Sequence, residues 1–513
     1  MSANPTASYP SPTGRCTKKP RQENPTDDVI IRSNSLQQNQ MTDNDRPHQF
    51  LEHDGCRLLL HSLSFLDVAT LLRKQAVSKQ FKELCSKAIT AKCGKDGPPP
   101  LTNKTLREAV KTYCDILYDP NSNKEDMEDI ACTYGFPIDS WNVSQVTDMS
   151  MLFFGDSYVI PPAIDDWVSS YSDVLKTVPY FNEYIGSWDT SNVTNMESMF
   201  YSAIQFNQDI GRWDVSKVTN MERMFFNTRE FNQDTGRWDV SSVETMNKMF
   251  HSAHEFNQDI GGWNVSNVKD MSCMFMEART FNQDIGGWDV SQVDLMNIMF
   301  SSAHEFNQDI GSWDVSRVED MTQMFASALK FNQDIGRWDV SNVYSMNNMF
   351  YFAHEFNQDI GSWDVSRVKG MDNMFASALK FNQDIGNWDV SHVESMNSMF
   401  ENAVEFNQDI GSWDVSRVTY MDKMFASAKT FNKDIGNWDV ANVEDMDYMF
   451  FGARQFNQDI RKWNVSNVQR MRCMFSDATA FKFDLSSWDV SHVLDKHGML
   501  PDGYPEKFRP RNL

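Results

Sequence analysis

The chain has 513 residues and a formal net charge of −24, and this charge is unevenly distributed. Residues 1–100 contain 14 Lys and Arg against 10 Asp and Glu, whereas residues 101–513 contain 33 against 61, so the two parts carry +4 and −28. A strongly acidic body repels phosphate backbones and anionic lipid headgroups, which argues against nucleic acid or a bare membrane as a partner. Basic protein surfaces or cations are the ligands that such a body favours.

The apolar residues are distributed too evenly for a membrane protein. No stretch approaches the run of about 18 apolar residues that a membrane span needs, and the N-terminus lacks the apolar core of a secretory signal. We therefore expect no membrane insertion and an intracellular location, cytoplasmic or nuclear. The eight cysteines form no C-x-x-C pair, which argues against a disulfide framework or a zinc site. Reduced thiols and no bound metal are expected.

The first part of the chain divides into three segments. Residues 1–48 are rich in Ser, Pro, Asn, Gln and Thr, cannot bury enough apolar surface to offset chain entropy, and are predicted to be disordered. Residues 49–96 have leucines at three- and four-residue spacings, which predicts a small all-α module. Residues 97–140 are predicted to form a helical cap, with amphipathic helices over 105–117 and 125–134.

A repeat occupies most of the remaining sequence. Thirteen tryptophans recur at an unbroken spacing of 25 residues over Trp188–Trp488, and Trp141 begins an earlier copy. Residues 141–500 are therefore predicted to be a stack of 25-residue coils, interrupted by an insertion at about 155–180 that would project as a loop. A polar tail, residues 501–513, follows.

One copy reads WDVSKVTNMERMFFNTREFNQDTGR. Its first residues alternate between inward and outward positions, as in a half-buried strand, and four later positions at i, i+3, i+4 and i+7 indicate one face of a short helix. These four are Met221, Met224, Phe225 and Thr228. Asn220, before the first Met, is of a type that caps helix N-termini. The predicted fold class is an α/β repeat solenoid, with one short strand and one short helix per coil.

The repeated unit, WDVSxVxxMxxMFxxAxxFNQDIGxW, resembles the BspA-like repeat family, a leucine-rich-repeat relative found in bacterial surface proteins. The resemblance covers roughly residues 100–500 and recurs copy after copy. It implies a leucine-rich-repeat-like solenoid and a role in adhesion or protein binding. The function that we predict first is therefore a non-enzymatic scaffold that binds protein partners.

The helical module has a resemblance of its own. The segment LLLHSLSFLDVATLLRKQAVSKQFKELC, residues 58–85, resembles an F-box, although Asp54 and Gly55 replace the usual Leu-Pro opening. The resemblance implies an alternative function, a substrate receptor that binds the adaptor of a cullin ubiquitin ligase through residues 50–90. The candidate adaptor-binding residues are Leu63, Phe65, Leu66, Leu71, Leu72, Val77 and Phe81.

Two polar columns run through the repeats, asparagines from Asn207 to Asn457 and aspartates from Asp209 to Asp484. Both residue types bond to nearby backbone in turns, and every coil needs turns. We interpret the columns as turn formers. A second alternative function, an adhesive surface that binds cations or mineral through the carboxylates, remains open.

Exposed positions that differ from copy to copy are the best candidates for partner recognition. The Asp and Ser of the WDVS segment hardly change, whereas the position after this Ser varies. The resulting candidates are Lys217, Ser242, Asn267, Gln292, Arg317, Asn342 and His392. The outer side of the expected helix, with Glu222, Arg223, Asn247 and Lys248, also varies. No nucleophile elbow, metal-ligand spacing or phosphate-binding glycine loop is present, so we expect no catalysis and no cofactor.

Overall fold

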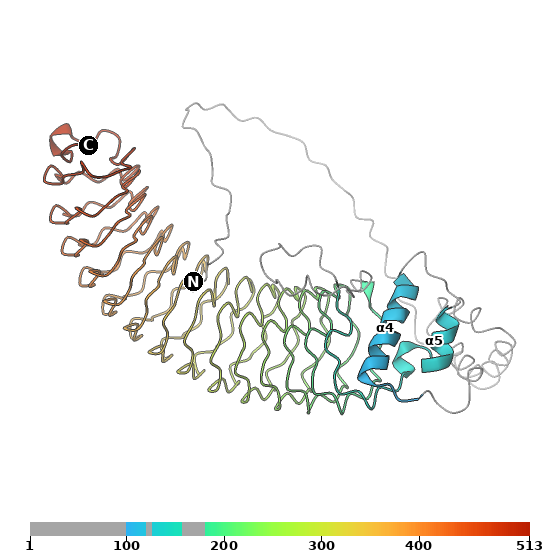
Figure 1. Ribbon diagram of the computed structural model, residues 1–513. Coiled ribbons are helices and arrows are strands. Elements are labelled where there is room, and N and C mark those ends of the chain that lie inside the picture. The colour runs from blue at the N-terminus through green and yellow to red at the C-terminus, as the bar shows by residue number, and fades with distance from the viewer. Residues whose placement is uncertain (1–98, 119–125, 156–179) are drawn as a thin grey trace, which may run out of the picture.

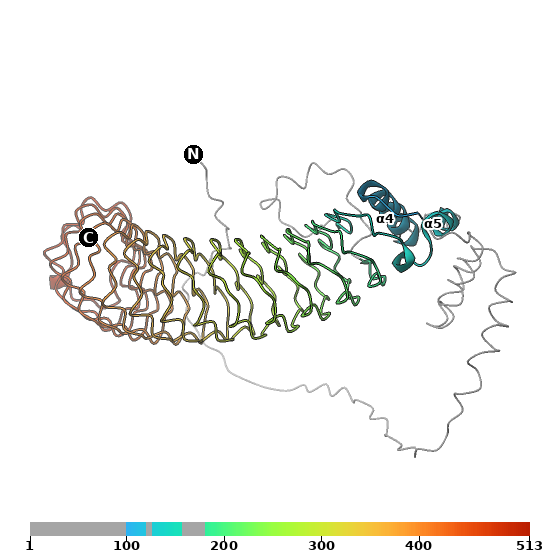
Figure 2. The ribbon, with the colours of Figure 1, turned by 90° about the horizontal axis from the view of Figure 1, so that it is seen from below.

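The computed structural model describes residues 99–118, 126–155 and 180–513. These residues form one curved array of stacked coils with helices at its N-terminal end (Figure 1). The same array seen from below shows the coils in a single row from the helices to the C-terminus (Figure 2). The predicted disordered tail, the F-box-like module and most of the insertion lie outside the described residues.

Two helices cover the first coil. Helix α4, Asn103–Tyr118, and helix α5, Asp126–Tyr134, correspond to the two helices predicted for the cap. Two short 3-10 helices follow them, η2 at Ile138–Ser140 before the first coil and η5 at Glu506–Phe508 after the last. None of the helices among the described residues is long and apolar enough to cross a bilayer.

Neighbouring coils are joined in parallel through one bridging residue each. Asn195 pairs with Asn220, which pairs with Thr245, and the series continues at 25-residue steps to Asp495. Asp148 pairs directly with Asn195, so the first two coils are in contact although the insertion separates them in sequence. Within the described repeats these are isolated bridges. The short strand predicted at the WDVS segment is not formed, because the only bridging residue of such a coil, for example Asn220, comes after that segment.

The short helix predicted in each coil is wrong, because tandem turns occupy its place. Met224 N–H donates to Met221 O at 3.2 Å and Thr228 N–H donates to Phe225 O at 3.1 Å. The third residue of each turn has positive φ, 55° at both Arg223 and Asn227, as a type II turn requires. A right-handed helix cannot contain such residues.

The backbone donors of this segment bond to the next coil. Met221 N–H donates to Thr245 O at 3.2 Å and Arg223 N–H to Asn247 O at 2.8 Å. We call this series, formed by residues 220–228 and their equivalents at 25-residue steps, the hydrogen-bond ladder. Because stacking supplies acceptors outside the coil, the backbone is satisfied without helical bonds.

The residue expected to cap the helix has a different role. Asn220 Oδ1 accepts a hydrogen bond from Glu222 N–H at 2.8 Å, and Asp270 Oδ1 accepts one from Ser272 N–H at 2.8 Å. Both form turns with the residue two positions later. The preference for Asn, Asp, Ser and Thr at this position thus reflects a turn that starts the ladder segment.

The core consists of aromatic and methionine columns in which each side chain packs on its equivalent in the next coil. Trp263 and Trp288 stack with ring centroids 6.5 Å apart, and both indoles are almost fully buried. The indole N–H groups of Trp213 to Trp463 each have an acceptor in the preceding coil, as Trp238 Nε1 donates to Ile210 O at 3.2 Å, whereas Trp488 Nε1 has none. Burial of Trp therefore leaves no polar cost at these positions.

The spacing of equivalent rings explains the bend in Figure 1. The centroids of Tyr201 and Phe226, which lie on the ladder, are 4.5 Å apart, whereas those of Trp188 and Trp213 are 6.5 Å apart. Neighbouring coils thus approach more closely at the ladder than at the tryptophans. The ladder lies on the inner side of the bend and the Trp column on the outer side.

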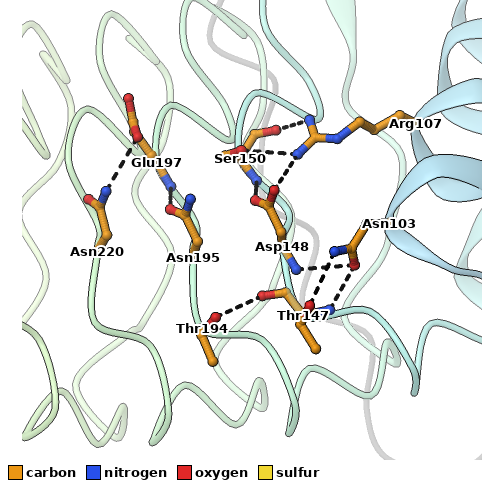
Figure 3. A network of polar contacts seen from close by, with 9 residues as sticks. All are labelled: Asn103, Arg107, Thr147, Asp148, Ser150, Thr194, Asn195, Glu197 and Asn220. Carbon is orange, nitrogen blue, oxygen red and sulfur yellow. Dashed lines mark hydrogen bonds and ion pairs between the residues drawn. The ribbon is translucent and has the colours of Figure 1, made fainter.

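The cap supplies the bonds that a preceding coil would otherwise make (Figure 3). Between later coils, Thr219 N–H donates to Thr194 O at 2.9 Å. At the first coil, Thr147 N–H donates instead to the Asn103 Oδ1 of α4 at 2.9 Å. Arg107, one turn further along α4, donates to the Ser150 carbonyl. In later coils, the carbonyl at this position accepts a ladder N–H from the coil before it. Helix α4 therefore completes the ladder with side chains.

The C-terminal residues cover the other end of the array. Tyr504 stacks on Phe481 with centroids 6.0 Å apart and so extends a Phe column by one ring. Arg511 N–H donates to Trp488 O at 2.8 Å, and Asp489 and Arg511 form a parallel bridge. The segment after the last repeat thus closes the core with the same types of contact that join the coils.

One cysteine departs from the expectation of reduced thiols. Cys132 is disulfide-bonded, whereas Cys114, Cys273 and Cys473 are free. These four are the only cysteines among the described residues. Burial raises the pKa of the Cys273 thiol to about 11, which leaves it protonated at neutral pH.

Candidate partner-binding surface

The seven residues predicted to recognise a partner belong to one line of side chains along the array. We call this line the variable column; it contains the residues at 25-residue steps from Asn192 to His492. The candidates in it are exposed, except for half-buried Ser242. None of its thirteen positions is acidic, although the chain as a whole is. The column therefore differs in charge from its surroundings.

Part of the variable column holds neighbouring coils together. Asn267 Nδ2 donates to Ser241 O and Asn342 Nδ2 donates to Ser316 O, each at 2.7 Å. Ser242 Oγ makes the equivalent bond to Ser216 O at 2.7 Å. The amide or hydroxyl groups of these side chains therefore donate to carbonyls of the preceding coil and help to hold the coils together.

The longer side chains of the column remain half exposed. Arg317 lies 2.8 Å from Asp294, and Lys217 Nζ donates to Asn192 Oδ1 at 2.8 Å. Gln292 Nε2 donates to the Ser291 carbonyl at 3.3 Å and its Oε1 accepts from Arg317 at 3.3 Å, whereas His392 contacts Ser391 Oγ at 3.4 Å. Exposed pairs of this kind contribute about 0–1 kcal/mol, so a partner can displace them at little cost.

The aspartate column forms turns within each coil, whereas the asparagine column joins neighbouring coils instead of forming turns. Asp209 Oδ1 accepts a hydrogen bond from Gly211 N–H at 3.0 Å, and Asn207 Oδ1 accepts one from Asn232 N–H at 3.0 Å. Hydrogen bonds from Ser216 lower the pKa of Asp214, which keeps this exposed carboxylate ionised. Among the described residues, no group of three or more acidic, His or Cys side chains is arranged to hold a metal ion.

The residue types on the outer side of the ladder also vary from coil to coil. The outward position after the first Met is Glu222 in one coil, Asn297 and Asp422 in others, and Arg472 near the end. Glu222, Asn297 and Asp422 are half-buried because neighbouring coils are close together here, whereas Arg472 is exposed. The earlier candidates Glu222, Arg223, Asn247 and Lys248 belong to this surface. Their variability was visible in the sequence, but the expected helix placed them on a different face.

Several aspartates of the ladder influence one another. Burial, together with the charges of Asp445 and Asp372, raises the pKa of the Asp422 carboxyl to about 6. Burial also raises the pKa of Asp447 above its ordinary value. This part of the ladder therefore carries carboxylates whose ionisation is unfavourable in the folded protein.

The folded protein binds the Asp422 proton more tightly than the unfolded chain, since its pKa rises from 3.8 to about 6. Stability from this group is thus greatest below the unfolded pKa and is lost as pH rises through the folded value. We expect Asp422→Asn to raise the urea midpoint at pH 8, with the gain disappearing towards pH 4. Asp389→Asn is the control. Hydrogen bonds from Ser391 lower its pKa, so this change should give no gain at pH 8.

Comparison with known families identifies the repeat. The family described as "Mycoplasma protein of unknown function, DUF285" matches six overlapping segments, which together span 385 of the 513 residues. The segments are residues 123–171, 162–262, 233–338, 303–410, 330–433 and 405–507. The chain belongs to the DUF285 family.

The DUF285 match supports the resemblance to BspA-like repeats and makes this chain a repeat protein. It does not extend to the F-box-like segment, residues 58–85. A search of curated proteins found no match. The family description assigns no function, so the function has to be argued from the surface of the DUF285 coils.

Proposed function

We propose that the DUF285 array is a non-enzymatic scaffold that binds protein partners along its coils. The proposal rests on one contrast: the buried residues are the same in nearly every coil, whereas many exposed side chains vary. The buried Trp, Met and Phe columns and the turn-forming Asp columns hardly change, whereas residue types in the variable column and on the outer face of the ladder vary between coils. Many small side-chain differences on a rigid extended frame are typical of repeat proteins that bind other proteins.

The proposal is tested by affinity capture with the full-length protein. Serine replaces four cationic residues of the variable column together: Lys217, Arg317, Arg367 and Arg417. We expect the captured partners to be lost or reduced at least tenfold. The control variant replaces Arg212, Arg237 and Arg337, which are equally exposed in a different column. Identical partners from the wild type and both variants would contradict a role for the variable column.

The alternative function as a cullin-ligase substrate receptor rests on the F-box resemblance alone, and residues 58–85 lie outside the described residues. The same capture experiment tests it with Leu66→Asp and Leu71→Asp. Recovery of a cullin adaptor by the wild type and its loss from this variant would support the receptor function. The cation-binding alternative predicts instead that Ca²⁺ raises the melting temperature.

A further inference from the structure

One line of side chains next to the ladder changes from charged to apolar along the array. We call it the edge column; it contains the residues at 25-residue steps from Arg229 to Arg454. Its first members are Arg229, His254, Arg279 and His304, and its last are Lys429 and Arg454. The coils between them have Leu329, His354, Leu379 and Val404, all half-buried. An apolar stretch therefore lies between two cationic ends.

Phe352, two residues before His354, is in an unusual position. Its φ is 57°, and 38% of its side chain is exposed. The equivalent residues in other coils are small or polar, such as Asn227, Ser302 and Asn402. A bulky residue at positive φ costs about 1–2 kcal/mol. The exposed part of the ring gains no free energy from burial that would offset this cost. Such an outlier is a reason to look for a function.

The ring of Phe352 joins the apolar part of the edge column. It lies 5.8 Å from the His354 ring and 4.6 Å from the Tyr351 ring, measured between centroids. We call this group the apolar strip; it contains Leu329, Tyr351, Phe352, His354, Leu379 and Val404. Ala326 and Ala376 occupy the positions equivalent to Tyr351 in the two neighbouring coils.

The repeat distance along the strip fits a helix. The edge column lies between the ladder, where coils are 4.5 Å apart at Tyr201 and Phe226, and the inner Phe column, where Phe356 and Phe381 are 6.0 Å apart. The α-helical pitch of about 5.4 Å falls within this interval. A helix along the strip would present one side chain to each coil. An extended strand, which repeats every ~6.6 Å on one face, would lose register.

The charges around the strip favour acidic groups at both ends of the ligand. Arg279 and Lys429 lie just outside it in the same column. The nearest internal lysines, Lys330 and Lys380, are already paired with Glu305 and Glu355. Arg279 lies 3.9 Å from Glu277, an exposed pair that a second carboxylate can join at little cost.

We propose that the apolar strip binds an amphipathic helix of another protein, with apolar residues against the strip and acidic residues at both ends near Arg279 and Lys429. This inference rests on the proposed protein-binding function and names one class of partner for it. The six coil steps from Arg279 to Lys429 correspond to about 32 Å, or about 22 helical residues. Binding would bury Phe352 and so offset the cost of its backbone conformation.

The test uses full-length protein and a labelled helical peptide of about 22 residues, with leucines on one face and glutamates at both ends. We expect saturable binding by fluorescence anisotropy. A peptide with lysines at the ends and one with serines in place of the leucines should each bind at least tenfold more weakly. Failure of the first peptide to bind, or equal binding of all three, would overturn the proposal.

Variants of the protein locate the site. Phe352→Asn should weaken binding at least tenfold while raising the melting temperature, because Asn tolerates positive φ and already occupies this position in other coils. Loss of binding therefore cannot be attributed to misfolding. Leu329→Ser with Leu379→Ser should also abolish binding. Leu295→Ser with Leu494→Ser removes exposed leucines elsewhere and should leave binding unchanged.

The same variants separate this inference from the proposed function. If cellular partners are captured normally by Phe352→Asn and lost with the variable-column variant, the strip is not the site and the scaffold function stands. If capture changes with neither variant, the scaffold function itself fails. If Phe352→Asn loses both the peptide and a cellular partner, the strip is the site for that partner.

Discussion

Replacing Gly261 with alanine will destabilise the array by about 3 kcal/mol, because the new methyl group has no room. A Cβ at this position would overlap the backbone carbonyl oxygen of Asp284 in the next coil. The oxygen belongs to the backbone, so relief requires the two coils to move apart, which strains the ladder and the stacked rings together. The same close approach occurs at Gly211, Gly236 and Gly311.

The adjacent residue provides the control for this prediction. A Cβ on Gly262 would meet no heavy atom within 4 Å, and Arg237 occupies the equivalent position one coil earlier. Gly262→Ala should be neutral or stabilise by about 0.4–1 kcal/mol through the unfolded chain. Denaturant midpoints followed by Trp fluorescence will compare the two variants. Equal midpoints would show that coil spacing is less restricted than the structure indicates.

Replacing Thr235 with isoleucine will stabilise the array by about 1–2 kcal/mol, since it removes an unpaired buried hydroxyl. The Thr235 side chain is fully buried, and its Oγ1 has no hydrogen-bond partner. Ile210 and Ile260 occupy the equivalent positions in the neighbouring coils and are also fully buried. The space between coils therefore accepts isoleucine without displacing the backbone.

Thr228 provides a matched comparison, because it too replaces the residue common in other coils. It is fully buried, but its Oγ1 donates to Phe200 O at 2.8 Å. Thr228→Ala should therefore give no gain and a loss of up to about 1 kcal/mol. Thermal melts of the two variants, compared with the wild type, will show midpoint shifts of opposite sign. If Thr228→Ala stabilised the protein, the gain would come from restoring the residue found in most coils, and the pairing of the hydroxyl would not explain it.

The repeat length, the family and the buried residues were predictable from sequence, whereas the backbone of each coil was not. Met221, Met224 and Phe225 are buried as expected, yet turns, not a helix, bring them inside. The i, i+3, i+4 pattern is common to a helix and to tandem turns of three residues each. Asn, Ser and Gly at the position of Asn227 were a usable signal for positive φ. Ile298, with φ 64°, gave no such signal, because a β-branched residue rarely adopts this conformation.

The candidate surface was predictable in part. Arg317 and His392 are exposed in the variable column, as repeat-to-repeat variation indicated. The structural bonds of Asn267 and Asn342 could not be foreseen, because their acceptors are carbonyls 26 residues earlier. The significance of Phe352 depends on its backbone conformation, which no sequence pattern gives. Such features become visible only when the position of the neighbouring coil is known.

The ladder has a consequence for how this gene can change. Every junction between coils uses the same bonds, and only the two ends need different residues, with Asn103 and Arg107 at one and Arg511 at the other. The stretches at 304–318 and 354–368 are nearly identical, so the gene segments that encode them can pair out of register during recombination. Gain or loss of whole coils between them would leave both ends intact. Descendant proteins can therefore differ in length by steps of two coils, about 10 Å, without acquiring a new fold.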